Sequence, residues 1–469
     1  MLFPTMIFGL FFLFVYATAW SLERENGRRK VFLVLVSWVF YGWWDWRFVG
    51  LLILSALFNW WAADRVSKSK GEAVRRWLIA LDVVVNLTVL GVFKYYGFFV
   101  DQLGGALKLM HWERDLPLLN IILPVGISFF TFQAISYVID VHRGKCAPAR
   151  SLLDVMLMMS FFPHLVAGPI VRGSDLLPQF AQTPRLTRGM ATHGLLLIVW
   201  GLLKKTVIAS ELSSGLVDQV FFDPTAYGAG DLLAATYGYA VQIYCDFSAY
   251  SDMAIGLAAL LGYRFPRNFD QPYRSTSLQE FWRRWHISLS SWLRDYLYIP
   301  LGGSRRGQFA TCINLMITMV LGGLWHGAAW TFIAWGALHG GVLSFERVWK
   351  QLKPASWPRW PAVMGLLITF HVVCLGWILF RSESFSQALS FLEGFQRIGT
   401  PVAVLTPFLA ALIALGLLMH FLPARAIESA TRAVKALPSP VLGVTVGLFI
   451  LLVEAMRPEG IAPFIYYQF

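Results

Sequence analysis

The sequence MVLGGLWHGAAWTF at residues 319–332 decides the fold, because a single histidine, His326, stands there in an otherwise apolar run. The run belongs to an apolar stretch over residues 314–345, and a helix needs roughly 20 such residues to cross a bilayer. Comparable stretches recur along the chain and predict about ten or eleven spans. We therefore expect an all-α polytopic membrane protein.

The composition excludes a soluble globular protein. Hydrophobic residues make up 57% of the chain and charged residues only 14%, with a mean hydropathy of +0.58, which leaves too little polar surface for a soluble globule. The net charge of +12 does not indicate nucleic-acid binding, because Lys and Arg concentrate in short segments between apolar stretches. We expect the widely spaced cysteines Cys146, Cys245, Cys312 and Cys374 to be packing residues, without a metal site or disulfide framework.

The basic segments predict an orientation. The first apolar stretch, residues 2–20, is followed by charges instead of a cleavage site, so we expect it to be a retained span. Basic clusters at residues 24–30 and 65–76 flank a hairpin that turns at residues 43–46, which places both clusters in the cytoplasm and Met1 outside. By the same rule we expect the C-terminal tail to lie outside.

The remaining spans follow from the apolar stretches. A span over residues 78–100 should lead to an outer loop at 101–116, and a span over 121–139 should return. The stretch 152–170 carries Pro163, Gly168 and Pro169, so we expect a re-entrant hairpin buried in protein. Further spans are expected at residues 191–208, 232–261, 314–345, 361–380, 402–421 and 441–456.

The segment FWRRWHISLSSWLRDY at residues 281–296 is too polar to cross a bilayer alone. At about 100° per residue, a helix there would have one apolar face, made by Trp282, Trp285, Leu289, Trp292, Leu293 and Tyr296. A neighbouring face would gather Arg283, His286, Ser290 and Arg294. This pattern is typical of an amphipathic helix at the membrane interface. It also suits a site where arginines hold the phosphates of an anionic donor such as a coenzyme A thioester.

His326 is the candidate catalytic residue. An ionisable group at membrane depth is costly, which makes a function the default hypothesis, although a backbone carbonyl could also satisfy the ring. Imidazole titrates near neutrality, so His326 can accept a proton from a hydroxyl that attacks a thioester. The neighbouring Gly322, Gly323 and Gly327 permit close helix approach or a local break.

Other polar groups in apolar stretches have less defined roles. His339 lies thirteen residues after His326, is rotated away from its face, and is interpreted as structural. His164 falls in the suspected re-entrant segment, where it can line a cavity. The polar run at residues 244–252, YCDFSAYSD, is too costly to face lipid and should line the bundle interior or a wet cavity.

Three long motifs resemble the membrane-bound O-acyltransferase family. They are QIYCDFSAYSDMAIG at 242–256, FWRRWHISLSSWLRDYLYIPLGG at 281–303 and LGGLWHG at 321–327, and the likeness extends to residues 123–129 and 161–169. Within the family the match is to the alginate O-acetyltransferase branch, and more distantly to the protein that exports D-alanine for teichoic acids.

The resemblance implies a ring of tilted helices with re-entrant segments around a central funnel. It implies one domain over residues 1–469, with core motifs at 120–345 and an aromatic tail at 457–469. The catalytic histidine of the family corresponds to His326 and its second histidine to His286. We expect the acetyl donor, acetyl-CoA, to be held by Arg283, Arg284, Trp285, Ser290, Arg294 and Trp325, and we expect no metal or permanently bound cofactor.

The tail PFIYYQF at residues 463–469 is a further similarity to envelope acyl-transfer systems. It can be an aromatic belt at the interface, or it can fold back so that Tyr466 accepts the acyl group, with Tyr467 as the reserve candidate. The chain has no G-x-S-x-G motif, so the resemblance implies a periplasmic partner similar to SGNH hydrolases that completes transfer to sugar hydroxyls.

The sequence therefore predicts an O-acetyltransferase of the bacterial inner membrane, with both termini periplasmic, that serves an exopolysaccharide, with alginate as the first candidate. Cellulose and peptidoglycan are alternative acceptors. A transporter of polysaccharide or lipid-linked sugar would also have broken helices and polar residues at mid-membrane, and a scaffold that recruits synthase subunits is a third class.

Overall fold

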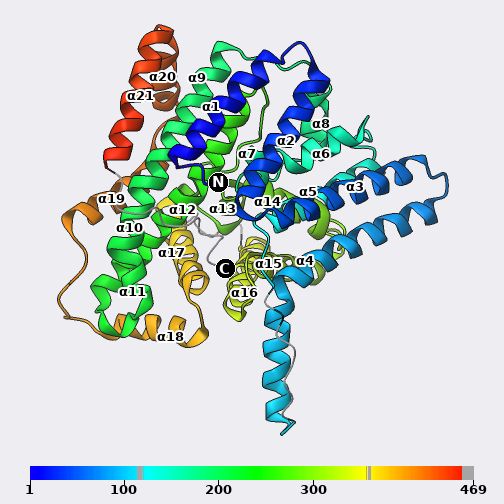
Figure 1. Cartoon of the computed structure of the whole chain (residues 1–469). Helices are drawn as coiled ribbons and strands as arrows, with labels where there is room; N and C mark the ends of the chain where they lie inside the picture. Colours follow the sequence, from blue (N-terminus) through cyan, green and yellow to red (C-terminus); the bar gives the residue numbers. More distant parts are fainter. Residues whose placement is uncertain (113–118, 120, 355, 357–360, 457–469) are drawn as a thin grey trace. The chain divides into compact units, whose positions relative to one another are not determined.

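The computed structural model describes residues 1–112, 119, 121–354, 356 and 361–456, and the secondary structure of these residues is helical (Figure 1). The chain divides into two compact units. The first comprises Met1–Met190 with Leu257–Pro266, and the second comprises Ala191–Gly256 with the chain from Arg267 onward. The all-α class predicted from the sequence is confirmed, whereas the ring, the funnel and the single domain stay predictions.

The first unit contains the helices that the basic segments were expected to separate. Its elements are α1 (Met6–Ser21), α2 (Asn26–Asp45), α3 (Arg47–Lys68), α4 (Glu72–Leu109), α5 (Ile127–His142), α6 (Leu152–Ser160), α7 (Phe162–Leu165) and α8 (Gly173–Phe180). The turn between α2 and α3 falls at Trp46, as predicted. The predicted outer loop at 101–116 is wrong in its first part, because α4 continues to Leu109.

Two predicted spans of this unit are shorter than expected. Helix α5 begins only after Gly126, which has a φ of +76° and packs against the Leu165 backbone, where a side chain would clash. The stretch 152–170 is broken after Ser160, and Pro163 stands in the first turn of the short α7. The predicted interruption is therefore present, while the re-entry of this stretch into a membrane stays a prediction.

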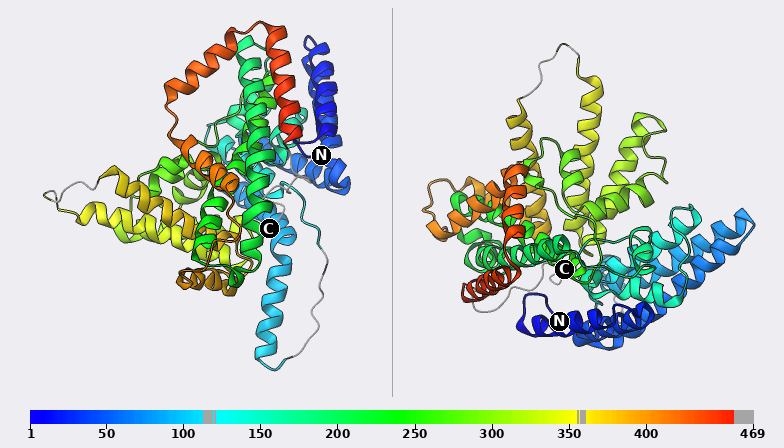
Figure 2. Two further views of the ribbon diagram at one scale, coloured as in Figure 1. Left: turned by 90° about the vertical axis from the view of Figure 1, so that its left-hand side faces the viewer. Right: turned by 90° about the horizontal axis from the view of Figure 1, so that it is seen from above.

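The second unit contains most of α9 and α12, together with the helices that follow them. Its elements are α9 (Arg188–Leu202), α10 (Ser210–Leu212), α11 (Asp218–Phe222), α12 (Ala229–Leu260), α13 (Leu278–Arg284), α14 (Ile287–Leu293), α15 (Gly307–His326), α16 (Trp330–Leu352), α17 (Ala362–Arg381), α18 (Phe385–Glu393), α19 (Pro407–Leu418), α20 (Ala424–Ala436) and α21 (Ser439–Ala455). Figure 2 shows α16 and α17 side by side, and the two helices are in contact.

The single span predicted over residues 314–345 is wrong, because α15 and α16 form a hairpin that breaks after His326. Glycines allow the two helices to approach closely: a side chain on Gly323 would meet the Phe332 carbonyl, and one on Gly336 would meet the Met319 carbonyl. The break leaves His326 at the very end of α15.

Four helices of the described residues, α3, α4, α15 and α17, are long and apolar enough to cross a membrane, or up to five if a bent pair over 428–436 and 439–455 is one span. This is fewer than the number of apolar stretches suggested. Several of those stretches form short helices, as in α1 and α6, and the 32-residue α12 carries acidic side chains along its length. The membrane character itself is confirmed by these helices.

Candidate functional site

The continuous helix predicted over residues 281–296 is interrupted in its first half. Helix α13 ends at Arg284, Trp285 is extended, and His286 has a left-handed backbone with a φ of 42° before α14 begins. Such a conformation costs a non-glycine residue about 1–2 kcal/mol. Backbone hydrogen bonds stabilise it: Ile287 N–H donates to the Asn268 carbonyl, and Asp270 N–H donates to the Arg284 carbonyl, both at 2.9 Å. Periodicity did not predict this break, because its cause lies in a separate segment.

A cavity of about 560 Å³ lies between α13, α14, α15 and α16. Arg283, Ser290 and Arg294, which were predicted to share a face, all line it. The chain also brings Arg347 and Lys350 of α16 to its wall, which the sequence analysis missed. Apolar side chains complete the lining: Trp282, Ile287, Leu293, Leu315, Met319 and Leu343.

The cavity is cationic. Four of its described lining residues carry positive charge, and Glu346 is the one acidic residue among them. The Glu346 carboxylate accepts backbone hydrogen bonds from Leu278 at 2.6 Å and Gln279 at 3.2 Å, so it caps the start of α13. The cavity thus combines an apolar wall with excess positive charge, which suits an elongated ligand with an anionic end.

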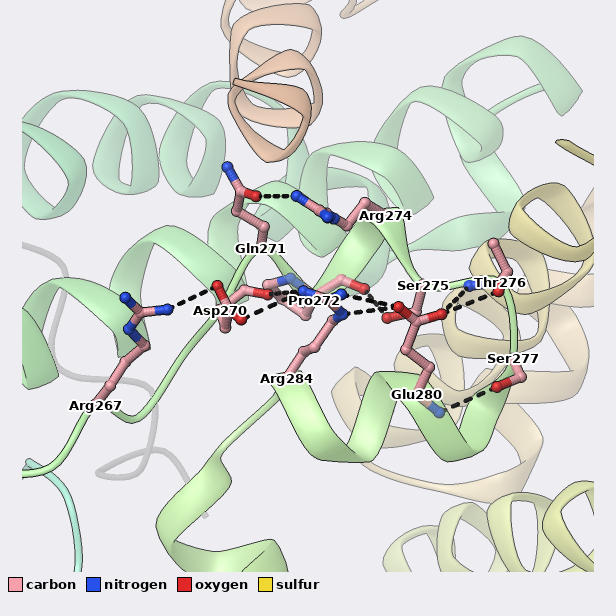
Figure 3. A network of polar contacts seen from close by, with 10 residues as sticks. All are labelled: Arg267, Asp270, Gln271, Pro272, Arg274, Ser275, Thr276, Ser277, Glu280 and Arg284. Atoms are coloured by element: carbon pink, nitrogen blue, oxygen red, sulfur yellow. Dashed lines mark hydrogen bonds and ion pairs between the residues drawn. The ribbon is translucent and has the colours of Figure 1, made fainter. Parts of the chain in front are cut away.

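Arg284 lies in a different environment (Figure 3). Its guanidinium is 2.9 Å from Glu280 and 3.3 Å from Asp270, and the Asp270 carboxylate also pairs with Arg267 at 2.9 Å. Arg284 lines a second hollow of about 470 Å³ that shares Arg283 and Lys350 with the first. Two carboxylates therefore offset its charge, so the geometry gives it a part in holding the end of α13.

His286 is fully buried and turns away from the cavity that Arg283 and Ser290 line. The rings of Phe247, at 4.6 Å between centroids, and Trp325, at 6.1 Å, pack against it. Burial lowers the pKa of His286 to about 3. The imidazole is therefore neutral at neutral pH and does not serve as a cation for phosphates.

His326 is also buried, with 4% of its surface exposed. The ring centroids of Trp325, Trp335 and Phe380 lie 5.0, 5.1 and 5.2 Å from that of His326, all nearly edge-on. His326 is not among the described residues that line the cavity, but Met319 is, two helical turns earlier on the same face of α15. Roughly 10 Å of helix axis separate these two positions.

Two residues that were predicted to hold the donor, Trp285 and Trp325, pack among aromatic rings. Trp325 is buried between the rings of His286 and His326. Trp285 is buried in an aromatic cluster, with its ring centroid 5.0 Å from that of Trp377. Neither residue lines the described cavity, so any contact with a donor would come at its far end.

His339 has the structural role that its position suggested. It is fully buried, and its Nδ1 accepts a hydrogen bond of 3.2 Å from the indole N–H of Trp282. This contact orients Trp282, which lines the cavity. In the first unit, His164 is buried, and its Nε2 lies 3.1 Å from the Met158 carbonyl, so the backbone satisfies this one ring nitrogen.

The polar run on α12 is buried as expected, and its partners are two lysines that the sequence analysis missed. Lys204 Nζ lies 2.6 Å from Ser248 Oγ and 2.7 Å from Asp252, and Lys205 lies 2.8 Å from Asp246. Both lysines are buried in a π-helical turn after α9. Their signal was present in the sequence, because two adjacent lysines interrupt the apolar stretch 191–208.

The candidate acceptors Tyr466 and Tyr467 fall outside the described residues, so their role stays a prediction. Asn268, by contrast, is a described residue of this site that the sequence analysis did not single out. It lies beside the break between α13 and α14 and contacts His286.

Comparisons with known proteins agree with the motifs. The model of the membrane-bound O-acyltransferase family matches residues 148–386. The chain is 43% identical over 410 residues to a protein named probable alginate O-acetylase AlgI of Pseudomonas aeruginosa, covering 85% of this chain and 76% of that protein. It is 35% identical to a peptidoglycan O-acetyltransferase of Helicobacter pylori, with coverages of 83% and 77%, and 28% identical to a teichoic acid D-alanyltransferase of Bacillus subtilis, with coverages of 59% and 73%.

Proposed function

The chain belongs to the membrane-bound O-acyltransferase family, and we propose that it passes acetyl groups from cytoplasmic acetyl-CoA across a bacterial inner membrane for the O-acetylation of alginate. Membership of the family makes it a membrane O-acyltransferase. The observation that carries the finer proposal is the cationic cavity at α13–α16, whose α15 wall leads to His326.

The cavity supports a coenzyme A thioester as donor. Such a molecule has phosphates at one end and a thioester at the other, joined by a long, weakly polar arm. Arg283 and Arg347 can form charge-assisted hydrogen bonds to phosphates, and Lys350 adds a further charge. The Arg294 guanidinium lies 2.7 Å from the Asp295 carboxylate, which offsets part of its charge. The apolar wall of Leu315 and Met319 suits the arm, which would extend along α15 toward His326.

His326 is the proposed general base. It takes the proton of an entering hydroxyl while the hydroxyl oxygen attacks the thioester carbon. The C–S bond then breaks, and the thiolate of coenzyme A leaves and takes the proton from the imidazolium. The new ester is carried by Tyr466 or by a serine of a periplasmic partner similar to SGNH hydrolases. Because His326 is buried, the donor arm must displace side chains near Leu293 and Trp325 to reach it.

The acceptor polymer is proposed from the relatives. Identity of 43% to the Pseudomonas protein favours alginate, and the Helicobacter relative makes peptidoglycan the second candidate. The relatives described above are named for alginate, peptidoglycan and teichoic acid. Transport of an intact sugar is disfavoured by the family, whose members are named for acyl transfer.

The test uses purified full-length protein in proteoliposomes with radiolabelled acetyl-CoA. We expect label to become attached to the C-terminal peptide, and Tyr466→Phe to abolish it while Tyr467→Phe does not. As a control, His371→Ala should leave the labelling unchanged, because this exposed histidine of α17 pairs with Tyr237 and lies outside the cavity. Label found nowhere on the chain would remove the tyrosine ester and favour direct transfer to the partner. Failure to consume acetyl-CoA, even with the partner present, would contradict the proposed function.

A further inference from the structure

Asn268 is a buried hub of hydrogen bonds at the break between α13 and α14. Its side-chain oxygen, Oδ1, lies 3.1 Å from the backbone nitrogen of Ser288, 2.8 Å from Ser288 Oγ and 3.2 Å from Nδ1 of His286. Its amide nitrogen, Nδ2, donates to Ser251 Oγ of α12 at 3.0 Å. Only 1% of Asn268 is exposed, so these protein groups satisfy its side chain in place of water.

The orientation of the Asn268 amide follows from one obligatory donor. The two ends of an asparagine amide differ only in their hydrogen bonds, and the backbone N–H of Ser288 can only donate. The atom that faces it must therefore be the carbonyl oxygen, because a flipped amide would bring two N–H groups together. Ser251 Oγ can accept, so the other end of the amide is satisfied as well.

This orientation fixes the proton on His286. The Asn268 oxygen can only accept, so Nδ1 of the neutral imidazole must carry the proton. In the other tautomer, Ser288 Oγ would have to donate to Nδ1 across the longer distance of 3.5 Å, and the Nδ1 lone pair would face the Asn268 oxygen. The arrangement of the three side chains therefore favours Nδ1–H, and Nε2 is left as the unprotonated nitrogen.

We propose that Asn268 is a positioning residue that holds His286 as the Nδ1–H tautomer, so that the ring presents Nε2 as its basic nitrogen. The inference rests on the proposed acyl transfer only in that His286, the second histidine implied by the family resemblance, takes part in it. Asn268 also holds the backbone next to His286, since its carbonyl accepts a hydrogen bond from the N–H of Ile287, beside the left-handed turn. His286 then begins the reaction as an acceptor of a proton or hydrogen bond.

Among the described polar contacts of His286, Asn268 Oδ1 lies nearer to Nδ1, at 3.2 Å, than Ser288 Oγ does, at 3.5 Å. Aromatic rings of Phe247, Phe269 and Trp325 pack against the imidazole, and they do not compete for the Nδ1 proton. Asp252, which pairs with Lys204, directly follows Ser251, and the Ser251 hydroxyl accepts a hydrogen bond from the amide nitrogen of Asn268.

The test reads the tautomer directly. Full-length protein labelled with ¹⁵N-histidine and held in lipid nanodiscs is examined by NMR, and the His286 signals are assigned by their loss in His286→Gln. We expect a protonated Nδ1 and an unprotonated Nε2 at neutral pH. Asn268→Asp keeps the acceptor but adds a negative charge. The pH at which His286 becomes protonated should therefore be about 1–3 units higher than in the wild type. Ser251→Ala, which leaves Oδ1 in place, should keep the Nδ1–H signal.

Activity gives a second readout. Asn268→Ala should lower acetyl transfer by about 10- to 100-fold, the range known for hydrogen-bond partners of metal-bound histidines. Asn268→Asp should lose activity more steeply than the wild type as the pH falls, because its His286 protonates sooner. A wild-type His286 with its proton on Nε2, or an unchanged tautomer in Asn268→Ala, would overturn the inference. Full activity in His286→Gln would instead show that His286 takes no part in acyl transfer, while the NMR result would still decide the tautomer.

Discussion

The buried histidines of this chain differ in their hydrogen-bond partners, and these partners indicate different roles. His339 accepts a hydrogen bond from Trp282 and is structural, whereas Nδ1 of His286 lies 3.2 Å from Asn268 Oδ1, the contact from which we infer the Nδ1–H tautomer. The sequence predicted His326 and His286 as the working pair because each interrupts an apolar or aromatic run. It could not predict Asn268, since nothing in RNFDQPYR at residues 267–274 indicates which distant ring its amide meets.

The arginines that line the cavity should govern donor affinity. Arg283→Ala and Arg347→Ala each remove charge-assisted hydrogen bonds worth about 1.5–3 kcal/mol, so the KM for acetyl-CoA should rise by about 10- to 100-fold with little change in kcat. Steady-state kinetics in proteoliposomes would measure this. Arg432→Ala, an exposed arginine of α20 outside the cavity, serves as the control. An unchanged KM in both cavity variants would argue against a phosphate-bearing donor at this site.

Arg284 should behave differently from its neighbour Arg283. Its ion pairs with Glu280 and Asp270 are partly exposed, so Arg284→Ala should lower the free energy of unfolding by about 1 kcal/mol or less and leave the KM for acetyl-CoA nearly unchanged. Thermal unfolding in detergent, combined with the same kinetics, separates the two effects. A large rise in the KM for acetyl-CoA without loss of stability would instead show that Arg284 binds the donor.

At the scale of elements, the periodicity of the sequence predicted which residues lie together better than it predicted where a helix breaks. Arg283, Ser290 and Arg294 reach one cavity although the helix breaks between them, because Ser290 and Arg294 are one turn apart and α13 ends beside them. The breaks at His286 and Gly327 depend on contacts with Asn268 and Phe332. These contacts join separate segments of the chain, and the helical repeat of a single segment does not predict them.

The α15–α16 hairpin depends on close packing at glycine. Gly336→Ala would place a methyl group against the Met319 backbone, which cannot move as a flexible side chain can, and overpacking of this kind costs about 1–3 kcal/mol. Gly341→Ala on the same helix is the matched control, because its nearest neighbour would be the end of Met316 at 4.0 Å. Thermal unfolding should show a lower Tm for Gly336→Ala alone. Equal Tm values would mean that the hairpin tolerates separation.

At the scale of the whole molecule, the composition was sufficient to predict a membrane protein, and the long motifs were sufficient to predict the family. Four or five helices of the described residues are long and apolar enough to span, whereas ten or eleven spans were expected, because several apolar stretches form short, broken or polar-interrupted helices. Periodicity alone does not distinguish these from spans.

The basic segments predict a fixed orientation that can be measured on the whole chain. In a background with the four cysteines replaced by serine, Lys70→Cys, in the segment between α3 and α4, should react with a membrane-impermeant maleimide only after the membrane is opened. Thr5→Cys, just before α1, should react in intact spheroplasts. The reverse pattern of labelling would invert the proposed topology and the side from which the donor enters.

The most direct test of the account compares donor binding with acetyl transfer in His326→Ala. The substitution removes the proposed base at the end of α15 but leaves the arginines of the cavity in place, so labelled acetyl-CoA should bind with nearly unchanged affinity. Single-turnover transfer should fall by about 10²- to 10⁴-fold, the contribution expected of a general base. Transfer at the wild-type rate in a folded, inserted His326→Ala protein would contradict the mechanism.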